Sequence, residues 1–411
     1  MKRLLLLAVA AGLVLAPVLV PGDQAAATFA PRWTGTWATA LTTASLGNTN
    51  NSLAGFANQS IRMIVRTSVG GEKLRIRVSN AYGAQPLSIG HATVGVPVEK
   101  GSPTLRPGSV HELTFGGSAA TTVYKGAEVL SDPADVDVPA LSELAVTLYL
   151  PAATGQTSWH WVSRETTYVY SGDQAATLDG TGATTSYGSF YFLAGVDVAS
   201  RHAQGSVVVL GDSVSDGFGS TVNANTRWPD ALANRIAGTA PVVGDPGVLN
   251  ESLSGNRVTH DGSEIGFTAL GNSGLARLDV DVFGQTGVRS VIVELGINDV
   301  QLSGDASDRV IEGLRQLAAQ LREHDVRVLI CTLGPFEGYS SWTPEKEATR
   351  AAINSYIRLN RHFDFVIDMD KVLRDPAAPT KLKAEFDSGD HIHPNDTGAS
   401  ALAAAVPLWT L

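Results

Sequence analysis

The chain has 411 residues, of which 40 are acidic and 30 are basic, so its formal net charge is −10. No cluster of lysine and arginine interrupts this acidic balance, which argues against a nucleic-acid-binding groove. The chain is longer than one ordinary domain, and its apolar and charged fractions, 44% and 17%, are those of a globular protein, so we expect two folded domains.

The first 27 residues have the pattern of a secretory signal peptide. The basic start Met1-Lys2-Arg3 is followed by an apolar run from Leu4 to Val20, and Ala25-Ala26-Ala27 supplies small residues for cleavage. The alternative is a membrane anchor, because the run approaches the ~20 residues that span a bilayer. We expect residues 1–27 to be removed, leaving a secreted extracellular protein without a stable membrane span.

Residues 28–200 are expected to form an all-β domain. Residues 62–66 and 74–78 alternate between polar and apolar side chains, as half-buried antiparallel strands do. Further strands are predicted at 87–94, 121–130, 144–150, 167–170 and 189–198, with turn residues between them and no helix of ordinary length. Many short strands separated by turns are typical of a β-sandwich or jelly roll.

Four tryptophans of this region, Trp33, Trp37, Trp159 and Trp161, allow two interpretations. They could line a sugar-binding surface, or they could pack in the core. Core packing is the commoner use of tryptophan and is the interpretation we favour.

Residues 201–411 alternate between strand and helix patterns. Strands are predicted at 207–210, 242–249, 291–295, 326–332 and 365–369, and helices at 275–283, 308–323 and 344–360. A further helix-compatible stretch contains Trp228, Leu232 and Ile236. This alternation predicts a parallel sheet covered by helices on both faces.

The first of these strands carries the strongest chemical signal. Four apolar residues, Val207–Leu210, stop abruptly at Gly211-Asp212-Ser213. The carboxyl end of such a strand is where open α/β sheets bind their ligands, and a helical turn opened by Ser213 would point backbone N–H groups at developing negative charge. An ordinary turn is the alternative when this segment is considered alone. No serine lies in a G-x-S-x-G pattern, so the usual α/β-hydrolase nucleophile elbow is absent.

Four short blocks in the C-terminal half resemble those of the SGNH hydrolases, also called GDSL esterases and lipases. They occur in the family's order, as Gly211-Asp212-Ser213 with Ser215-Asp216-Gly217, then Leu253–Asn256, Gly296–Asp299 and Asp390–Pro394. Val214 stands where the family name has leucine, which is a mild departure. The resemblance implies a flavodoxin-like three-layer α/β domain, and the preceding β region resembles that of some carbohydrate esterases in layout.

The resemblance also implies which residues carry the reaction. Ser213 would be the nucleophile, and the base would come from the segment that contains Asp390, His391 and His393. An aspartate three residues before a histidine can orient its ring in a curled loop, which favours His393 over His391. Asp390 as a loop cap is the alternative in isolation.

Two further positions are assigned by the resemblance to the oxyanion hole. Gly255 would contribute its backbone N–H and Asn298 its side-chain amide, beside the N–H of Ser213. For Asn298 the alternative is an ordinary turn residue.

Three other residues carry weaker signals. Glu294 interrupts an apolar strand, and a buried carboxylate needs a partner, which could be Arg289, Arg257 or neither. Cys331 is the only cysteine and lies in an apolar run, so we expect a buried structural thiol. His391 and His393 alone do not make a metal site, and we expect neither metal nor cofactor.

We therefore expect a secreted serine esterase that works through an acyl-enzyme, with acyl esters of carbohydrates as the leading substrate class. An extracellular lipase or lysophospholipase is one alternative, and a carbohydrate- or surface-binding protein with an inactive hydrolase domain is another. Acyl length, alcohol and oligomeric state are left open. Because all four blocks follow residue 201, we expect the C-terminal half alone to retain some activity on small esters.

Overall fold

The computed structural model describes residues 30–243, 245–359 and 362–411. The predicted signal peptide, residues 1–27, therefore lies outside the described residues. None of the helices in the described part combines the length and the apolar character needed to cross a bilayer.

A five-stranded parallel sheet organises the C-terminal half. Its order is β17-β16-β18-β19-β20, built from β16 (Ala203–Gly211), β17 (Asp245–Asn250), β18 (Val288–Glu294), β19 (Arg327–Cys331) and β20 (Phe365–Ile367). Every neighbouring pair is parallel. In β16, Val207 and Val209 pack into one apolar cluster and Val208 and Leu210 into another, because successive side chains of a strand point to opposite faces. The sheet is thus buried on both sides, as predicted.

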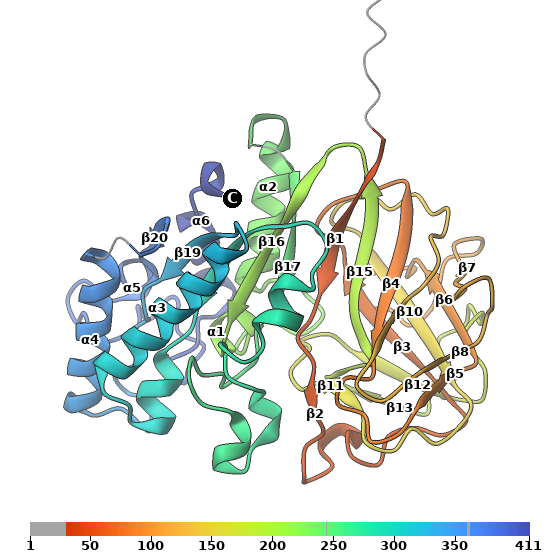
Figure 1. Ribbon diagram of the computed structural model, residues 1–411, viewed down its shortest axis with the longest axis horizontal. Coiled ribbons are helices and arrows are strands. Elements are labelled where there is room, and N and C mark those ends of the chain that lie inside the picture. The colour runs from red at the N-terminus through yellow and green to blue at the C-terminus, as the bar shows by residue number, and fades with distance from the viewer. Residues whose placement is uncertain (1–29, 244, 360–361) are drawn as a thin grey trace, which may run out of the picture. The chain divides into compact units, whose positions relative to one another are not determined.

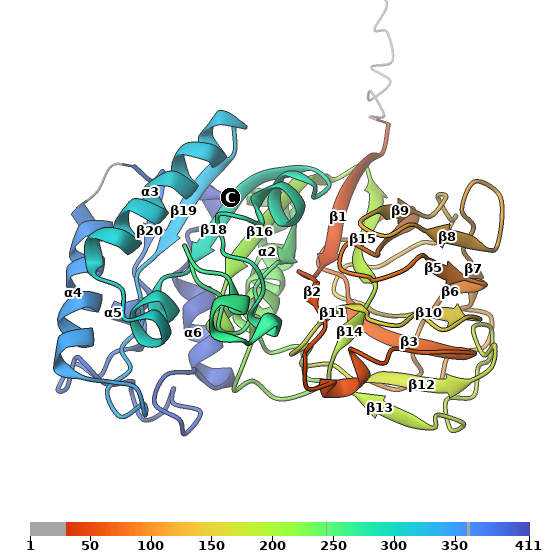
Figure 2. The ribbon, with the colours of Figure 1, turned by 60° about the horizontal axis from the view of Figure 1, so that its bottom comes forward.

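Helices cover both faces of this sheet (Figures 1 and 2). Helices α3 (Ser307–Glu323) and α4 (Pro344–Leu359) contribute to the same cluster as Val208 and Leu210. Helices α2 (Trp228–Val243), α5 (Met369–Leu373) and α6 (Asp396–Ala405) contribute to the cluster of the opposite face. The predicted three-layer α/β arrangement is confirmed.

Several predicted elements of this half have other bounds, and the strand expected at 365–369 ends at Ile367 because Met369 begins α5. The strand expected from residue 242 begins at Asp245, because Val242 and Val243 end helix α2. An apolar β-branched run does not by itself distinguish a strand from a buried helix end. The helix expected at 275–283 is a series of turns followed by the short π-helix η4 (Asp279–Phe283).

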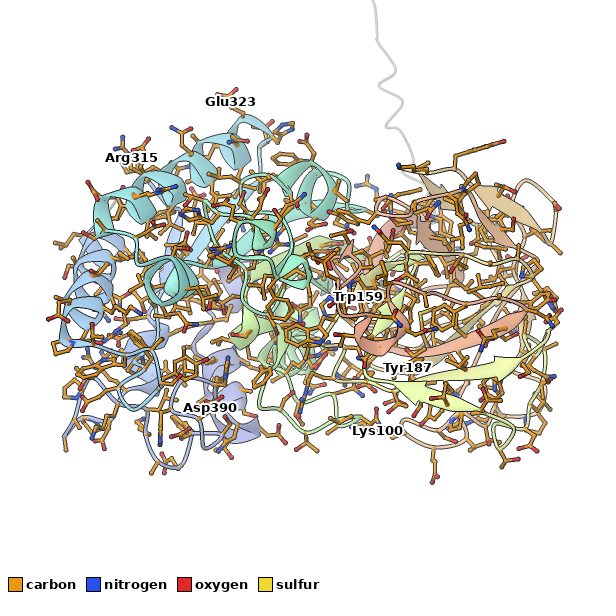
Figure 3. The ribbon with its side chains drawn as sticks, turned by 90° about the horizontal axis from the view of Figure 1, so that it is seen from below. Lys100, Trp159, Tyr187, Arg315, Glu323 and Asp390 are labelled. Carbon is orange, nitrogen blue, oxygen red and sulfur yellow. The ribbon has the colours of Figure 1, made fainter. Side chains whose placement is uncertain are left out.

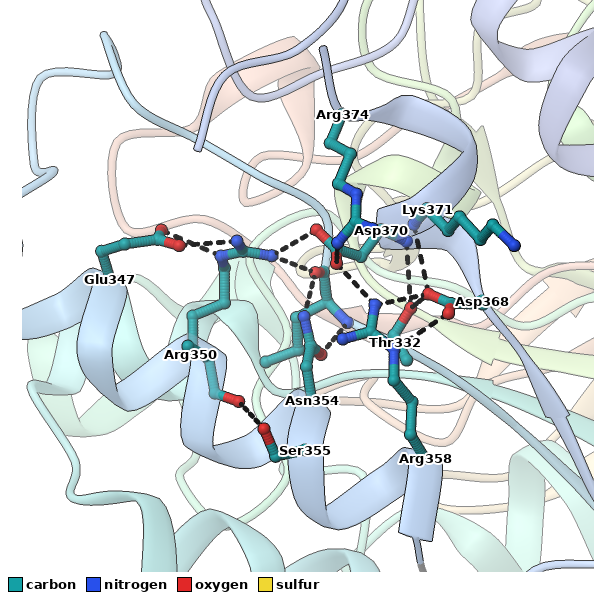
Figure 4. A network of polar contacts seen from close by, with 12 residues as sticks. Thr332, Glu347, Arg350, Asn354, Ser355, Arg358, Asp368, Asp370, Lys371 and Arg374 are labelled. Atoms are coloured by element: carbon teal, nitrogen blue, oxygen red, sulfur yellow. Dashed lines mark hydrogen bonds and ion pairs between the residues drawn. The ribbon is translucent and has the colours of Figure 1, made fainter. Parts of the chain in front are cut away.

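A charged network fixes α4 to the carboxyl end of the sheet (Figure 4). The carboxylate of Asp370 accepts hydrogen bonds from three arginines, Arg350 at 2.7 Å, Arg358 at 2.5 Å and Arg374 at 3.2 Å. Its side chain is only 3% exposed, so these pairs are screened less by water than ordinary surface pairs. Arg358 also binds Asp368, which follows β20.

The N-terminal region is a β-sandwich (Figure 1). One sheet has the order β1-β15-β4-β9 and the other β13-β12-β3-β10-β6-β7, with smaller sheets β14-β11-β2 and β5-β8 beside them. The strands are β1 (Arg32–Ala38), β2 (Thr42–Thr43), β3 (Gln59–Arg66), β4 (Lys73–Ser79), β5 (Leu87–Ile89), β6 (His91–Gly95), β7 (His111–Glu112), β8 (Thr121–Val123), β9 (Glu128–Leu130), β10 (Glu143–Leu150), β11 (Ser158–His160), β12 (Thr167–Ser171), β13 (Thr185–Tyr187), β14 (Phe190–Tyr191) and β15 (Leu193–Ser200). One apolar core lies between the two larger sheets, with Ile76 and Val196 from the first and Met63 and Val146 from the second.

Three strands that the sequence predicts as continuous are each divided in two. The breaks fall at Gly90, at the turn 124–127 that contains Gly126 with φ 78°, and at Phe192 with φ 61°. A positive φ turns the chain out of the extended conformation, so a ladder cannot continue through it.

The four tryptophans lie in different surroundings, and Trp33 in β1 is half-buried with the guanidinium of Arg75 4.4 Å from its ring centroid. Trp37 and Trp159 are buried in the core of the sandwich, as favoured from the sequence. Trp161 is only half-buried and lies beyond the end of β11.

The β region and the α/β region pack against one another within a single compact unit, Pro31–Leu411. Strand β1 runs beside β17, where Thr39 pairs with Asn250 and the N–H of Val248 donates to Ser68 Oγ at 2.9 Å. The predicted boundary near residue 200 falls between β15 and β16. The two regions are therefore in direct contact close to the carboxyl ends of the central strands.

Candidate active site

Ser213 is the first residue of α1 (Ser213–Asp216), directly after β16. The carboxylate of Asp212 caps this turn by accepting from the N–H of Val214 at 3.1 Å. Gly211 is required by space, since a Cβ there would lie 2.5 Å from Ser215 Oγ. The apolar strand, the glycine and the cap together place the hydroxyl of Ser213 at the end of the sheet, as the sequence predicts.

A chain of hydrogen bonds joins Ser213 to the last block. His393 Nε2 lies 2.8 Å from Ser213 Oγ, and His393 Nδ1 lies 2.5 Å from Asp390 Oδ2. The other oxygen of Asp390 accepts from the backbone N–H of His393 at 2.9 Å and of Ile392 at 3.1 Å. The three predicted residues are therefore brought together in the order serine, imidazole and carboxylate.

These hydrogen bonds set the charge of Asp390. Partial burial raises the pKa of Asp390, but the bonds from the His393 ring and from the N–H groups of His393 and Ile392 outweigh it, so the pKa lies well below its usual range. Asp390 is thus an anion that fixes the ring orientation of His393. Figure 3 shows Asp390 on the α/β side of the molecule.

His391 occupies a different place on the same loop. Its Nδ1 lies 2.7 Å from Asp387 Oδ2, and its side chain is 53% exposed. Its backbone has φ 72°, which turns the loop so that His393 faces inward. No hydrogen bond among the described residues joins His391 to Ser213.

Two backbone N–H groups of the site, those of Ser213 and Gly255, are free to donate a hydrogen bond to a ligand. Neither the N–H of Ser213 nor that of Gly255 has a hydrogen-bond acceptor in residues 30–243, 245–359 and 362–411. Gly255 has φ 81°, and a Cβ at this position would lie 2.5 Å from Leu270 Cδ2, so both conformation and space select glycine. Ser213 and Gly255 line the same cavity, and two N–H groups without acceptors there suit an oxyanion.

Asn298 lies at the same cavity, but both of its amide protons have acceptors within the protein. Its Nδ2 donates to Asp212 Oδ2 at 3.0 Å and to the carbonyl of Asn256 at 3.1 Å, and its Oδ1 accepts from Gln301 at 2.6 Å. A role as the third oxyanion donor requires Nδ2 to share or exchange one of these bonds. That role stays a prediction.

The partner of Glu294 is neither of the two arginines considered from the sequence. Glu294 Oε2 accepts from Ser215 Oγ at 2.8 Å and lies 3.4 Å from the N–H of Asp212. Ser215 Oγ in turn accepts from the indole N–H of Trp228 at 2.9 Å. Burial raises the pKa of Glu294, and burial together with Glu294 raises that of Asp212, so this carboxyl pair retains a proton more readily than exposed carboxyls.

Asp299 is a site residue whose role the sequence does not reveal. Its buried carboxylate accepts from the N–H of Val258 at 2.9 Å and from that of Thr259 at 3.2 Å. These bonds tie the third block to the loop that follows Gly255. Trp161, which the sequence placed either in the core or on a sugar-binding surface, lines the cavity of this site.

Ser213, His393 and Asp390 line a cavity of about 440 Å³ whose surface is mostly apolar. Trp161 comes from the β region and meets Phe267 edge to face at a centroid separation of 5.0 Å. The lining residues are Trp161, Ser213, Phe218, Ser254, Gly255, Ile265, Phe267, Leu270, Asn298, Gln301, Leu302, Tyr339, Asp390 and His393. The β region therefore supplies part of the wall of the site.

The two side observations from the sequence can also be placed. Cys331 is buried and reduced at the end of β19, and burial raises the pKa of its thiol well above the usual range. Across the described ranges, no three histidine, cysteine, aspartate or glutamate side chains are arranged to hold a metal ion.

Comparison with known proteins gives a match over the C-terminal half. Residues 209–401 match the GDSL-like lipase/acylhydrolase family. Similar solved structures include TesA, with 22% identity over 49% of this chain and 95% of that one at a TM-score of 0.37. The psychrotrophic esterase EstA of Pseudoalteromonas sp. inhibited by monoethylphosphonate has 16% identity over 49% of this chain and 93% of that one, at a TM-score of 0.35. A GDSL-like lipase of Bacteroides thetaiotaomicron VPI-5482 has 16% identity over 48% of this chain and 84% of that one, also at a TM-score of 0.35. No curated protein matches the chain.

Proposed function

We propose that Ser213, His393 and Asp390 hydrolyse a carboxylic ester through an acyl-enzyme. The match of residues 209–401 to the GDSL-like lipase/acylhydrolase family supports carboxylic ester hydrolysis as the activity. The observation that carries the proposal is the continuous hydrogen-bond chain from Asp390 through His393 to Ser213, at 2.5 and 2.8 Å, which ends at the cavity.

The first half of the reaction forms the acyl-enzyme. Ser213 Oγ attacks the ester carbonyl carbon while His393 Nε2 accepts its proton. The carbonyl oxygen becomes an anion that the N–H groups of Ser213 and Gly255 stabilise, with Asn298 as the predicted third donor. When the intermediate collapses, the alcohol leaves with the proton from Nε2.

The second half repeats the sequence with water. His393 accepts a proton from water, which attacks the acyl carbon, and then returns a proton to Ser213 Oγ as the acid leaves. Asp390 stays ionised throughout, because its hydrogen bonds favour the charged form.

The lining of the cavity supports esters with an apolar acyl group. Four of its apolar side chains are partly exposed at its surface, namely Phe218, Ile265, Phe267 and Leu302. Burying an acyl chain against them is favourable by about 0.8 kcal/mol per methylene group. This supports a lipid ester or an acylated alcohol of another kind over a small acetyl group. Carbohydrate as the alcohol portion rests on the predicted export, the acidic charge balance and the layout of the β region, and it is kept as a proposal.

Ser213→Ala with a serine-directed phosphonate tests the chemistry. We expect the wild type to hydrolyse p-nitrophenyl esters and to be labelled once per chain at Ser213, and the variant to lose both properties while keeping its melting temperature. Labelling at Ser215 or full turnover in the variant would refute the assignment. Esters from acetate to palmitate, acetylated xylan and a phospholipid then rank the substrates.

The predicted signal peptide extends this proposal to export. N-terminal sequencing of protein recovered from culture medium would show a start near residue 28 if residues 1–27 are removed. Recovery with the cells and an intact Met1 would contradict it.

A further inference from the structure

A buried histidine of the β region is hydrogen-bonded to the first sequence block of the site. His160, the last residue of β11, places Nε2 2.9 Å from Asp216 Oδ1 and Nδ1 2.9 Å from the carbonyl of Ala40. Nε2 also lies 3.0 Å from the carbonyl of Val162. The side chains of His160 and Asp216 are 3% and 2% exposed, so water replaces none of these contacts.

Both ring nitrogens of His160 face acceptors only. An imidazole that donates from both nitrogens is protonated, so the arrangement is a buried ion pair with Asp216. Burial lowers the pKa of His160, but the charge of Asp216 and the bonds to Asp216, Ala40 and Val162 raise it by more. Arg164 and Arg227 also act on Asp216 electrostatically, yet neither is hydrogen-bonded to it among the described residues.

The same carboxylate holds the second block. Asp216 Oδ2 accepts from the backbone N–H of Ser254 at 2.9 Å and from Ser254 Oγ at 2.6 Å. Two bonds from one residue fix its backbone, and the next peptide unit carries the N–H of Gly255. That N–H is one of the two open donors of the site, so its direction depends on how Ser254 is held.

We propose that His160 is a positioning residue for ester hydrolysis, which acts from the β region through Asp216 and Ser254 to aim the N–H of Gly255 at the oxyanion. The inference rests on the proposed function, because it concerns the same oxygen atom. It explains why a β-sandwich outside the four sequence blocks contacts the active site. His160 touches neither the substrate nor the reacting atoms.

The role predicts a particular kinetic signature. A donor that stabilises the oxyanion contributes mainly in the transition state, so its misplacement lowers kcat with little change in KM. Removing one such donor costs roughly 10²–10³-fold in kcat, and misaligning one should cost less, about 10–100-fold. If His160 had only a structural role, its replacement would lower the melting temperature without lowering kcat selectively at constant KM.

Two variants of the same residue separate the bonds of His160. In His160→Gln the amide nitrogen takes the place of Nε2 and can still donate to Asp216, whereas in His160→Asn it takes the place of Nδ1 and can donate only toward Ala40. We expect His160→Asn to lower kcat on a p-nitrophenyl ester about 10–100-fold, with KM within about threefold of wild type. His160→Gln should recover most of that loss. His91→Asn is the control, since His91 binds Glu112 and Asp173 at the far side of the β region.

Inhibition by phenylboronic acid gives a second readout, because its serine adduct is tetrahedral and places an oxygen among the oxyanion donors. We expect its Ki to rise in His160→Asn by a factor close to the fall in kcat. Equal kcat values for the Asn and Gln variants, or a rise in KM alone, would overturn the proposal. So would a wild-type kcat in His160→Asn.

Failure of His160→Asn to fold would leave Ser254→Ala to decide the matter. This variant keeps the N–H bond to Asp216 and loses the hydroxyl bond, so kcat should fall about 3–10-fold at constant KM. A wild-type kcat there would also overturn the proposal. Absence of Ser213-dependent turnover in the wild type would instead refute the proposed function, so the two failures are distinct.

Discussion

His391 and His393 each bind an aspartate of the same loop, yet only one of them faces Ser213. His391 is paired with Asp387 and is 53% exposed, whereas the ring of His393 is buried between Asp390 and Ser213. Phe218 packs against the buried ring at a centroid separation of 4.6 Å. Position within the loop, and not the presence of a carboxylate partner, therefore determines which histidine can act as the base.

We predict that His393→Ala removes most of the turnover and that His391→Ala retains it. Without the imidazole no group accepts the proton of Ser213, and kcat should fall by about 10⁴-fold or more. His391→Ala should also keep the pH profile of kcat/KM that the wild type shows. Steady-state kinetics on a p-nitrophenyl ester provide the measurement, and the opposite behaviour of the two variants would refute the assignment of the base.

The sequence locates the site residues that are tied to a short pattern. Ser213, Asp390 and His393 follow from local spacing and block order, and the structure joins them through contacts across 180 residues. The bond between Glu294 and Ser215 spans 79 residues, and that between His160 and Asp216 spans 56. No local pattern marks these pairs, because they form only when β18, β11 and α1 come together.

At the scale of whole elements, the predicted and observed bounds agree best where an apolar repeat continues over many residues. Helix α3 was expected at 308–323 and spans Ser307–Glu323, with an apolar stripe that faces the sheet. Element ends agree less well, as at β17, where α2 continues through two β-branched residues that the sequence pattern assigns to the strand. Glycine and positive φ divided three strands that the sequence predicted as single ones.

The connection between β11 and β12 carries a buried carboxyl with an unusual titration. Glu165 is 3% exposed, and its Oε2 has no hydrogen-bond partner among the described residues. Burial raises the pKa of Glu165 to about 8, with Arg227 opposing the rise and Glu143 and Asp230 adding to it. The folded protein therefore binds a proton here that the unfolded chain releases near pH 4.5.

The direction of the pH dependence follows from this difference. The folded protein holds the Glu165 proton more tightly than the unfolded chain does, so the contribution of Glu165 to the free energy of unfolding is complete below pH 4.5. That contribution should decrease by a few kcal/mol as the pH rises to about 8. Glu165→Gln cannot titrate, so we predict that its melting temperature falls less between pH 5 and 8 than that of the wild type. The exposed variant Glu312→Gln is the control, and parallel curves for wild type and Glu165→Gln would contradict the prediction.

At the scale of the whole molecule, the β region is part of the structure that supports the active site. It supplies Trp161 to the cavity wall and His160 to the bond with Asp216. Retention of activity by residues 201–411 alone, expected because all four blocks lie there, remains a prediction. Such a fragment would lack both side chains and the packing of β1 against β17, so its kcat measures how much these contacts contribute.

Close backbone approach is what allows the two regions to meet. A Cβ on Gly247 of β17 would lie 1.9 Å from the carbonyl oxygen of Gly35 in β1, a distance no side chain can tolerate. Two residues beyond β1, the carbonyl of Ala40 accepts the hydrogen bond from His160 Nδ1. A displacement of β1 from β17 should therefore reach the oxyanion donor through His160 and Asp216.

We predict that Gly247→Ala lowers the free energy of unfolding by about 2 kcal/mol or more, because the methyl group forces β1 away from its neighbour. Its kcat on a small soluble ester should fall at nearly constant KM, as for a misplaced oxyanion donor. Gly238→Ala in α2 is the matched control, since a Cβ there meets nothing within 4 Å and alanine favours a helix. Thermal unfolding and steady-state kinetics on both variants test the prediction. A Gly247→Ala protein with the stability and kcat of the wild type would show that close contact between the two regions is not needed to shape the active site.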